Sequence, residues 1–371
     1  MVIVFTLGTL AHKTLPHNAI LGLFPWIGAE RLGGAQLSGR LAWDGVQGGV
    51  NQQYGRSDLF CYAPGVEPRY VASLPQAHVA SSQVQAVRLA LGKMWQPDVV
   101  LIWHMSLLRL LPFFRIRSAS VVLFLHGIEV WRRHDLLTRL LLPRVNLFVS
   151  NSTYTWQRFL DFHPDLTVKP QQTVYLGVDT PIDTPSTDPS DPPAVLIVSR
   201  LDRREDYKGH RELIAAWPLV LQHIPHAELW IAGDGDLRPA LEQLIAARGL
   251  TQHICFFGRI SEEQKQDLLM RCRCFAMPSR GEGFGLVYLE AMRLGRPCLV
   301  SDCDAGREVV NPPEAGLAVN PDDTHALAAA LLRLLTPGDE WSQWSIQARQ
   351  RYESQFTARH FQERLVDALA R

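Results

Sequence analysis

The sequence predicts an α/β protein with two doubly wound parallel sheets, one in each half of the chain, that face each other across a cleft. Three observations predict it. Short apolar runs alternate with helical patterns along most of the chain, as in parallel sheets covered by helices. A segment rich in Pro, Ser, Thr and Asp, residues 181–193, separates two such series. The 371 residues suffice for two domains of roughly 150 to 200 residues each.

Apolar runs that end in polar residues mark the strands expected in the first half. They lie at residues 19–26, 57–63, 98–104, 120–127, 146–152 and 173–178. After the first run, Gly33 and Gly34 open a helix, which is compatible with a phosphate or sugar contact and equally with a tight turn. A further helix is expected over residues 81–94. Residues 1–18 fit neither pattern.

The same alternation starts again after the linker. Strands are expected at residues 194–201, 228–233, 254–260, 275–279, 297–303 and 316–319, with a helix near residues 210–221 and a helical tail from residue 341. The domains are therefore predicted to cover residues 1–180 and 194–345, joined by a linker at 181–193. The last helix, at residues 346–371, is expected to pack back toward the first domain.

The stretch RGEGFGLVYLEAMRLGRP, residues 280–297, is the strongest functional signal. It reads as a strand end, a glycine loop and a helix that begins near Phe284 or Gly285, and glycines let a backbone approach a phosphate closely. Glu282 and Glu290 are eight positions apart, so their carboxylates are predicted to lie roughly 10 Å apart on either side of the helix start. That spacing suits hydroxyl groups at the two ends of a sugar diphosphate. The alternative is an ordinary surface loop and helix.

Three further side chains are expected at the carboxyl ends of strands, where doubly wound sheets bind ligands. Arg200 and Lys208 follow the first strand of the second half, and together they would neutralise a diphosphate. Alone, each reads as a surface charge. His126, followed by Gly127, ends a strand of the first half, and both a structural and a site role are open for it. His104 reads as structural.

Composition and charge limit the other functions. The first 180 residues hold 16 Lys and Arg against 10 Asp and Glu, which favours an anionic partner such as a lipid phosphate or a membrane surface. No nucleic-acid motif accompanies these charges, so nucleic acid is not an expected partner. The apolar, arginine-bearing segment at residues 106–118 suits either membrane docking or a plain crossover. The six cysteines lack metal or disulfide spacing, which favours a cytoplasmic setting.

Five segments of the second half resemble one known family over about 150 residues. They are SRLDRREDYKG, ELWIAGDGDLRPAL, CFFGRI, PSRGEGFGLVYLEAMRLGRPCLVSD and GLAVNPDD, and their order and spacing are similar to the donor domain of family-4 retaining glycosyltransferases of the glycosyltransferase-B fold. The first half resembles the family more loosely, in LGGAQ, LHGIEVW, VSNSTYT and VYLGVD. Its Gly-Gly loop, at residue 33, comes later than in family members.

The resemblance implies two Rossmann-like domains and a hexosyltransferase. It would move a hexose from a UDP- or GDP-linked sugar to a hydroxyl of a glycan or lipid-linked acceptor, with retention and without a metal or cofactor, in polysaccharide or glycoconjugate biosynthesis. A peripheral contact with the inner face of the membrane is compatible with the basic first domain.

The resemblance also implies roles for individual residues. Arg200 and Lys208 would bind the diphosphate, Glu282 the sugar, and His126 would touch the sugar near the reacting carbon. The implied donor contacts are Glu290 at the ribose, Gly258, Arg259 and Ile260 at the base, Gly33 and Gly34 at the phosphates, and Gly283, Phe284, Gly285 and Leu286 in the loop.

Three other functions compete with glycosyl transfer. A glycosidase also uses two carboxylates, but paired cations beside them argue against it. A sugar-nucleotide epimerase would form product without an acceptor. An inactive sugar-nucleotide-binding subunit of a complex is disfavoured by Arg200, Lys208, Glu282 and Glu290, all of which are present.

Overall fold

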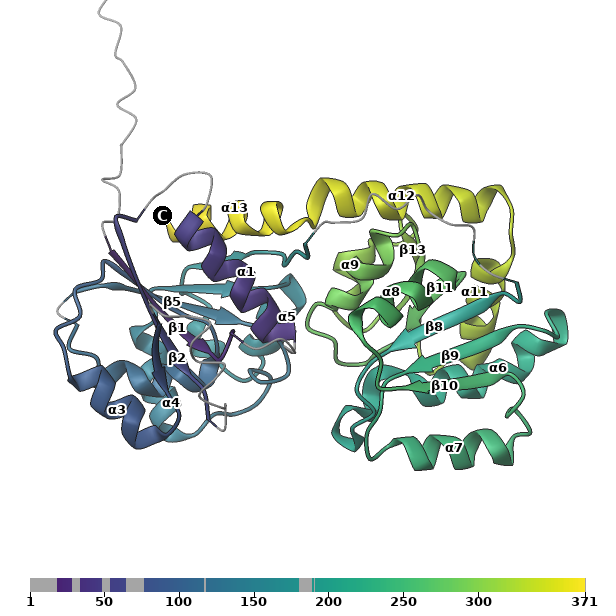
Figure 1. Cartoon of the computed structure of the whole chain (residues 1–371), viewed down its shortest axis with the longest axis horizontal. Helices are drawn as coiled ribbons and strands as arrows, with labels where there is room; N and C mark the ends of the chain where they lie inside the picture. Colours follow the sequence, from purple (N-terminus) through teal and green to yellow (C-terminus); the bar gives the residue numbers. More distant parts are fainter. Residues whose placement is uncertain are drawn as a thin grey trace, which may run out of the picture.

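The computed structural model describes residues 19–28, 34–48, 54–64, 77–116, 118–179, 189 and 191–370. The expectations for residues 1–18, for Gly33 and for most of the linker lie outside these ranges. Two parallel sheets, each covered by helices, form two domains that lie side by side (Figure 1). The predicted fold class is confirmed.

The first domain has a seven-stranded parallel sheet with the order β3-β2-β1-β4-β5-β6-β7. Its strands are β1 (Ala19–Pro25), β2 (Arg56–Tyr62), β3 (Ala77–Ala80), β4 (Val99–Ile102), β5 (Ser120–Leu125), β6 (Leu147–Ser150) and β7 (Gln171–Thr173). Its helices are α1 (Gly34–Gly48), α3 (Gln83–Leu91), α4 (Leu136–Leu141) and α5 (Thr153–Leu160), with 3₁₀ turns η1 (Met105–Phe113), η2 (Leu142–Arg144) and η3 (Pro164–Leu166). The strand order reverses direction beside β1, which places a ligand-binding crevice at the carboxyl ends of the neighbouring strands.

Two strands of this sheet differ from the prediction. The strand expected at residues 173–178 is β7, Gln171–Thr173, which is shifted toward the N-terminus. The reason is that the chain leaves the sheet after Val174 and instead pairs at Val178 with Thr357, near the end of the chain. Strand β3 was not predicted, because its four residues include the polar His78 and lack a clear apolar run.

The second domain has a six-stranded parallel sheet with the order β10-β9-β8-β11-β12-β13. Its strands are β8 (Ala194–Val198), β9 (Glu228–Ala232), β10 (Ile254–Gly258), β11 (Cys274–Met277), β12 (Cys298–Ser301) and β13 (Gly316–Val319). Its helices are α6 (His210–His223), α7 (Arg238–Ala247), α8 (Glu262–Arg271), α9 (Leu286–Met292), α10 (Gly306–Val310) and α11 (Thr324–Leu335), with the 3₁₀ turn η4 (Arg203–Lys208). The expected strands of this half match these positions closely, because each is a short buried run bounded by turn residues.

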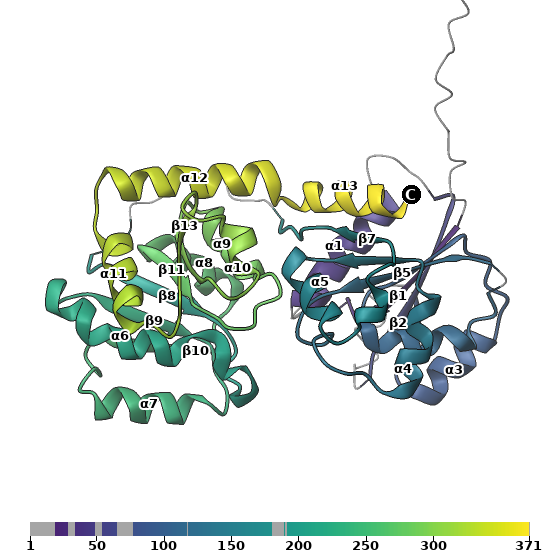
Figure 2. The same cartoon turned by 180° about the vertical axis from the view of Figure 1, so that it is seen from behind.

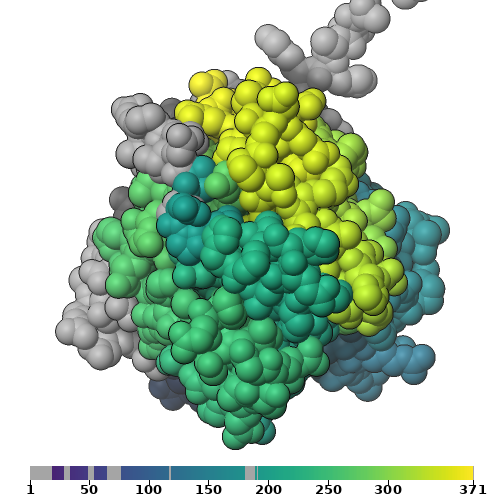
Figure 3. All heavy atoms as spheres, turned by 90° about the vertical axis from the view of Figure 1, so that its right-hand side faces the viewer, coloured from purple at the N-terminus to yellow at the C-terminus, as the bar shows by residue number. Residues whose placement is uncertain are grey.

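Two helices at the end of the chain connect the domains along one side (Figures 1 and 2). The long helix α12 (Asp339–Gln355) lies on the second domain, and in Figure 3 its yellow atoms cover the upper part of that domain. Helix α13 (Ala358–Leu369) packs against α1 of the first domain, and Gln362 donates to the Leu41 carbonyl at 3.0 Å. The helical tail is thus divided in two, with Thr357 as the N-cap of α13.

Buried aromatic rings hold α13 to the first domain. The ring of Trp103, at the end of β4, contacts Phe24 of β1, Phe124 of β5 and Phe361 of α13. Among the described helices, none is both long and apolar enough to cross a membrane.

Candidate active site

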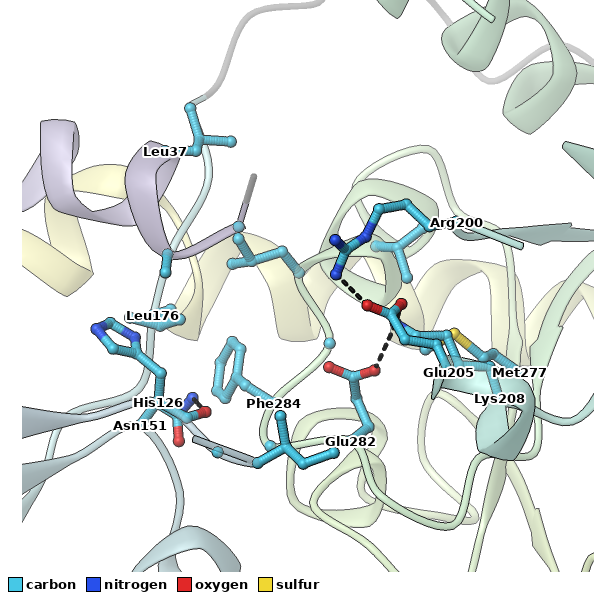
Figure 4. A pocket seen from close by; sticks show the side chains of 18 of the residues that line it. Leu37, His126, Asn151, Leu176, Arg200, Glu205, Lys208, Met277, Glu282 and Phe284 are labelled. Carbon is cyan, nitrogen blue, oxygen red and sulfur yellow. Dashed lines mark hydrogen bonds and ion pairs between the residues drawn. The ribbon is translucent and has the colours of Figure 1, made fainter. Parts of the chain in front are cut away.

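A cavity of about 710 Å³ lies between the two domains, a volume typical of small-ligand sites. Its walls come from residues that follow strands of both sheets: His126 after β5, Arg200 after β8 and Glu282 after β11 (Figure 4). Gly34, at the start of α1, also lines it. Segments far apart in the sequence therefore converge on one cleft at the carboxyl ends of the strands, as expected for this sheet topology.

The backbone of the glycine loop at residues 281–285 lies in direct contact with the backbone of the first domain. A Cβ atom on Gly283 would lie 2.3 Å from the carbonyl oxygen of His126, and Ser152 Oγ donates to the Gly283 carbonyl at 2.7 Å. Gly285, with a φ of 87°, is the N-cap of α9 and gives that helix no side-chain cap. Gly283, Phe284, Gly285 and Leu286 all line the cavity. Helix α9 begins one residue after Gly285 and has seven residues, so its dipole is a small contribution beside the nearby cations.

Asp304 holds this loop in place from the end of β12. Its carboxylate accepts the backbone N–H groups of Glu282 and Gly306, each at 2.9 Å. Burial raises the pKa of Asp304 to about 7, against the opposing effect of these two hydrogen bonds. Asp304 is not among the predicted site residues, although it directly follows the predicted strand at residues 297–303 and so stands, like Arg200, at the carboxyl end of a strand.

Arg200 and Lys208 lie on the cavity wall and share an acidic neighbour, Glu205 (Figure 4). Arg200 forms an ion pair with Glu205 and its side chain is 77% exposed, whereas Lys208 is 17% exposed and lies 3.5 Å from Glu205 and 3.4 Å from Glu282. Burial lowers the pKa of Lys208, but the two carboxylates outweigh burial and raise it above its ordinary value. Lys208 is therefore a charged side chain that bridges two acids at the cleft.

The partner of Glu290 is Lys265, which comes from the neighbouring helix α8. Their side chains are 2.9 Å apart, and Lys265 also lies 2.8 Å from Glu262. Burial lowers the pKa of Lys265, but Glu290 and Glu262 outweigh it and raise the pKa. Lys265 lines the cavity as well. It adds a third cation that sequence spacing alone did not indicate, because 25 residues separate it from Glu290.

His126 is held by the first domain and is neutral. Its Nε2 lies 2.6 Å from the carbonyl oxygen of Trp103, so Nε2 carries the proton and Nδ1 is left as an acceptor. Burial lowers its pKa to about 4. The backbone around it is fixed by Glu129, which accepts the N–H groups of His126 and Gly127, and by Asn151, which donates to the His126 carbonyl.

Not every predicted site residue reaches the cavity. Gly258, which ends β10, and Arg259 and Ile260, which follow it, are not among the residues that line the cavity, whereas Gly34 is. Gly33 lies outside the described residues. Two Asp-x-Asp pairs, a spacing that can hold a metal ion, occur in the second domain: Asp234 with Asp236, and Asp302 with Asp304. In each pair one carboxylate already accepts backbone N–H groups: Asp304 those of Glu282 and Gly306, and Asp236 that of Arg203. Within the described ranges, no group of three or more His, Cys, Asp or Glu is arranged to hold a metal.

Glu308 of the second domain fixes the domains against each other beside the cleft. Its carboxylate accepts the backbone N–H groups of Thr153 at 2.9 Å and Tyr154 at 2.7 Å, in the first turn of α5, and the hydroxyl of Tyr175 at 3.3 Å. A carboxylate at a helix N-terminus is a favourable arrangement. These three hydrogen bonds join the two domains beside the cleft.

Comparison with known proteins identifies the family of the chain. A family model for glycosyl transferases of group 1 matches residues 192–337. A phosphatidyl-myo-inositol mannosyltransferase of Mycolicibacterium smegmatis is 35% identical over 164 residues, which span 43% of this chain and 41% of that protein. A second relative, from Corynebacterium glutamicum, is 30% identical over 281 residues, which span 68% of this chain and 70% of that protein. It is named as a GDP-mannose-dependent mannosyltransferase of a monoacylated phosphatidylinositol monomannoside.

The chain belongs to the group 1 glycosyltransferases. Anabaena HepE, solved in complex with UDP-glucose, superposes with a TM-score of 0.71 over 95% of this chain and 99% of that one, at 19% identity. A likeness at this identity concerns the fold, and it confirms the glycosyltransferase-B architecture. The family model and the Corynebacterium glutamicum relative confirm the family that the sequence resembles.

Proposed function

We propose that this group 1 glycosyltransferase moves a hexose from a nucleoside-diphosphate sugar to a hydroxyl of a glycan or lipid-linked acceptor. The observation that carries the proposal is the convergence of Arg200, Lys208 and Lys265 with Glu282 and Glu290 on one cavity between the domains. Three cations suit a diphosphate, and two carboxylates suit hydroxyl groups on either side of it. A glycosidase has no need of three cations beside its two carboxylates.

Each side chain has a role in this proposal. Lys208 and Arg200 bind the diphosphate and stabilise the negative charge that develops on it as the bond to the anomeric carbon breaks. Glu282 accepts a hydrogen bond from the hexose and Glu290 from the ribose. The neutral His126 offers Nδ1 as an acceptor to a sugar hydroxyl. Because these cations supply the positive charge, we propose a reaction without a metal ion or cofactor.

Retention of the anomeric configuration is part of the proposal. The leaving phosphate would take the proton of the acceptor hydroxyl on the same face of the sugar from which it departs. This assignment needs no carboxylate nucleophile from the first domain. The product's anomeric configuration, read by NMR, tests it directly.

The names of the relatives support mannose as the sugar and GDP as the base. Both relatives named above are called mannosyltransferases of phosphatidylinositol or its mannosides, and one name includes GDP-mannose. We therefore propose GDP-mannose as the first donor to test and an inositol-containing lipid as the first acceptor, at a membrane surface. UDP-glucose is the alternative donor.

The donor is tested by thermal unfolding with GDP, UDP and ADP, because a ligand that binds only the folded state raises its stability. We expect one nucleotide to raise the melting temperature of the natural protein and not that of the Lys208→Ala or Glu290→Ala variants. Conversion of the donor sugar without any acceptor would instead indicate an epimerase. A shift without transfer to any acceptor would indicate an inactive sugar-nucleotide-binding subunit, and absence of any shift would contradict the proposed donor site.

A further inference from the structure

One face of the first domain carries most of the exposed large apolar side chains. It is formed by α3, η1 and α4, where α3 and α4 both pack on η1 and lie near each other at the lower edge of the domain (Figures 1 and 2). Of the eleven such side chains exposed in the described residues, seven lie on or directly after these elements. They are Val84, Leu91, Met94, Phe113, Leu136, Leu137 and Leu140. We call this surface the α3–α4 face; apolar patches of this kind mark interaction sites.

The α3–α4 face is also strongly basic. The three segments that form it, residues 83–94, 105–116 and 131–144, contain eight basic residues and one acidic residue. The basic residues are Arg88, Lys93, Arg109, Arg115, Arg132, Arg133, Arg139 and Arg144. The acidic residue, Asp135, is the N-cap of α4 and is paired with Arg109. Lys93 is paired as well, with Asp58 of β2 at 3.0 Å. The positive charge available to a partner therefore lies on the other six basic residues, which have no ion-pair partner among the described residues.

A second cavity, of about 410 Å³, opens on this face beside α4. Arg133 and Arg139 line it together with Leu136 and Leu140, which are 69% and 65% exposed. Among the described residues, neither arginine has an ion-pair partner. The buried His163, whose Nε2 has no hydrogen-bond partner in the described part of the chain, also lines it. Asp165 is the one acidic side chain on its wall.

We propose that the α3–α4 face docks on an anionic lipid bilayer and that the cavity beside α4 accepts the phosphate of a lipid headgroup between Arg133 and Arg139. Exposed leucines surrounded by arginines fit the boundary between headgroups and acyl chains. A second copy of the same face is a poor occupant, because a symmetric contact would bring the six unpaired basic residues of one copy against those of the other.

The position of the face relative to the cleft suits a lipid-linked acceptor. Glu129 lines the main cavity and Arg133 lines the cavity beside α4, and four residues span at most roughly 14 Å. A bilayer on this face would present acceptor headgroups near the mouth of the cleft. The presentation of lipid-linked acceptors to the cleft rests on the proposed function, whereas the docking of the face on a bilayer does not.

The test is co-sedimentation with vesicles in the absence of any nucleotide sugar, so that its result is independent of the donor. Vesicles of phosphatidylcholine are compared with vesicles that also contain phosphatidylglycerol. The test variants are Arg133→Gln/Arg139→Gln and Leu136→Ser/Leu140→Ser. Ile346→Ser, which changes an exposed apolar residue on α12, is the matched control. Thermal unfolding checks that each variant is folded.

We expect binding only to the anionic vesicles, weaker at high salt. Loss of each arginine is expected to reduce it about fivefold, and loss of each leucine on the order of tenfold. Equal binding to both vesicle types, or unchanged binding by both double variants, would overturn the proposal. So would a dimer that the leucine variants dissociate, which would make this face a contact between copies. Stabilisation by inorganic phosphate without vesicle binding would reassign the cavity to a free anion.

Discussion

Replacement of Lys208 by alanine tests the electrostatics of the cleft. In the natural protein Lys208 lies between Glu205 and Glu282, whose side chains are 14% and 20% exposed. The change removes a cation that the proposed diphosphate would contact and leaves two carboxylates to repel it. A hydrogen bond to a charged group contributes about 1.5 to 3 kcal/mol, which corresponds to a loss of affinity of roughly 10- to 160-fold. The added repulsion places the expected loss near the upper end.

The measurement is isothermal titration of the natural and variant proteins with the nucleoside diphosphate that the thermal screen selects. The corresponding nucleoside, which has no phosphate, serves as a second ligand and is expected to bind both proteins equally. Arg204→Ala is the matched control variant, because Arg204 is exposed, lies on the same turn η4 and does not line the cavity. The reasoning is refuted if folded Lys208→Ala protein binds the diphosphate within about threefold of the natural protein, since that is under 1 kcal/mol.

Three further predictions concern closure of the cleft and stability. Gly283→Val is expected to hold the domains apart, because the new Cβ would lie 2.3 Å from the His126 carbonyl oxygen; a larger radius of gyration by small-angle scattering, with nucleotide binding weakened, checks it. Glu308→Ala removes the acceptor of two N–H groups of α5 and is expected to weaken donor binding about tenfold or more without loss of fold, whereas Glu242→Ala, at an exposed site on α7 of the same domain, is not. Burial lowers the pKa of His210 to about 4, so the folded state binds fewer protons than the unfolded state between about pH 6.5 and 4, and stability falls as the pH falls through that range. His210→Asn is expected to reduce this slope by up to about 1.4 kcal/mol per pH unit in denaturant titrations, and an unchanged slope would contradict the assignment.

The sequence predicted the parts of the site that depend on local chemistry. Gly283 and Gly285 stand out because glycine is a poor start for a helix unless a close contact requires it, and the structure places the first domain's backbone against Gly283. Arg200 was found because polar residues that end the strands of a doubly wound sheet face the ligand crevice.

Contacts between helices and strands that are distant in the chain could not be predicted from the sequence. Lys265 is on α8 and Glu290 on α9, and nothing in either helix indicates that the two side chains meet. Glu308 reaches α5, 154 residues earlier in the chain, only because the two domains lie against each other there. The strand expected at residues 173–178 was shifted because Val178 pairs with Thr357 at the far end of the chain. Each of these depends on tertiary packing, which no local pattern encodes.

Transfer of the sugar itself is the most direct test of the central claim. The purified chain is incubated with GDP-mannose labelled in the sugar, or with UDP-glucose, and with vesicles that contain phosphatidylinositol, and lipid-linked label and free nucleoside diphosphate are measured together. The account predicts that both products form in equal amounts, and that Lys208→Ala loses both while Arg204→Ala keeps them. Release of neither product from any donor that the protein binds, or conversion of the donor sugar without the acceptor, would contradict it.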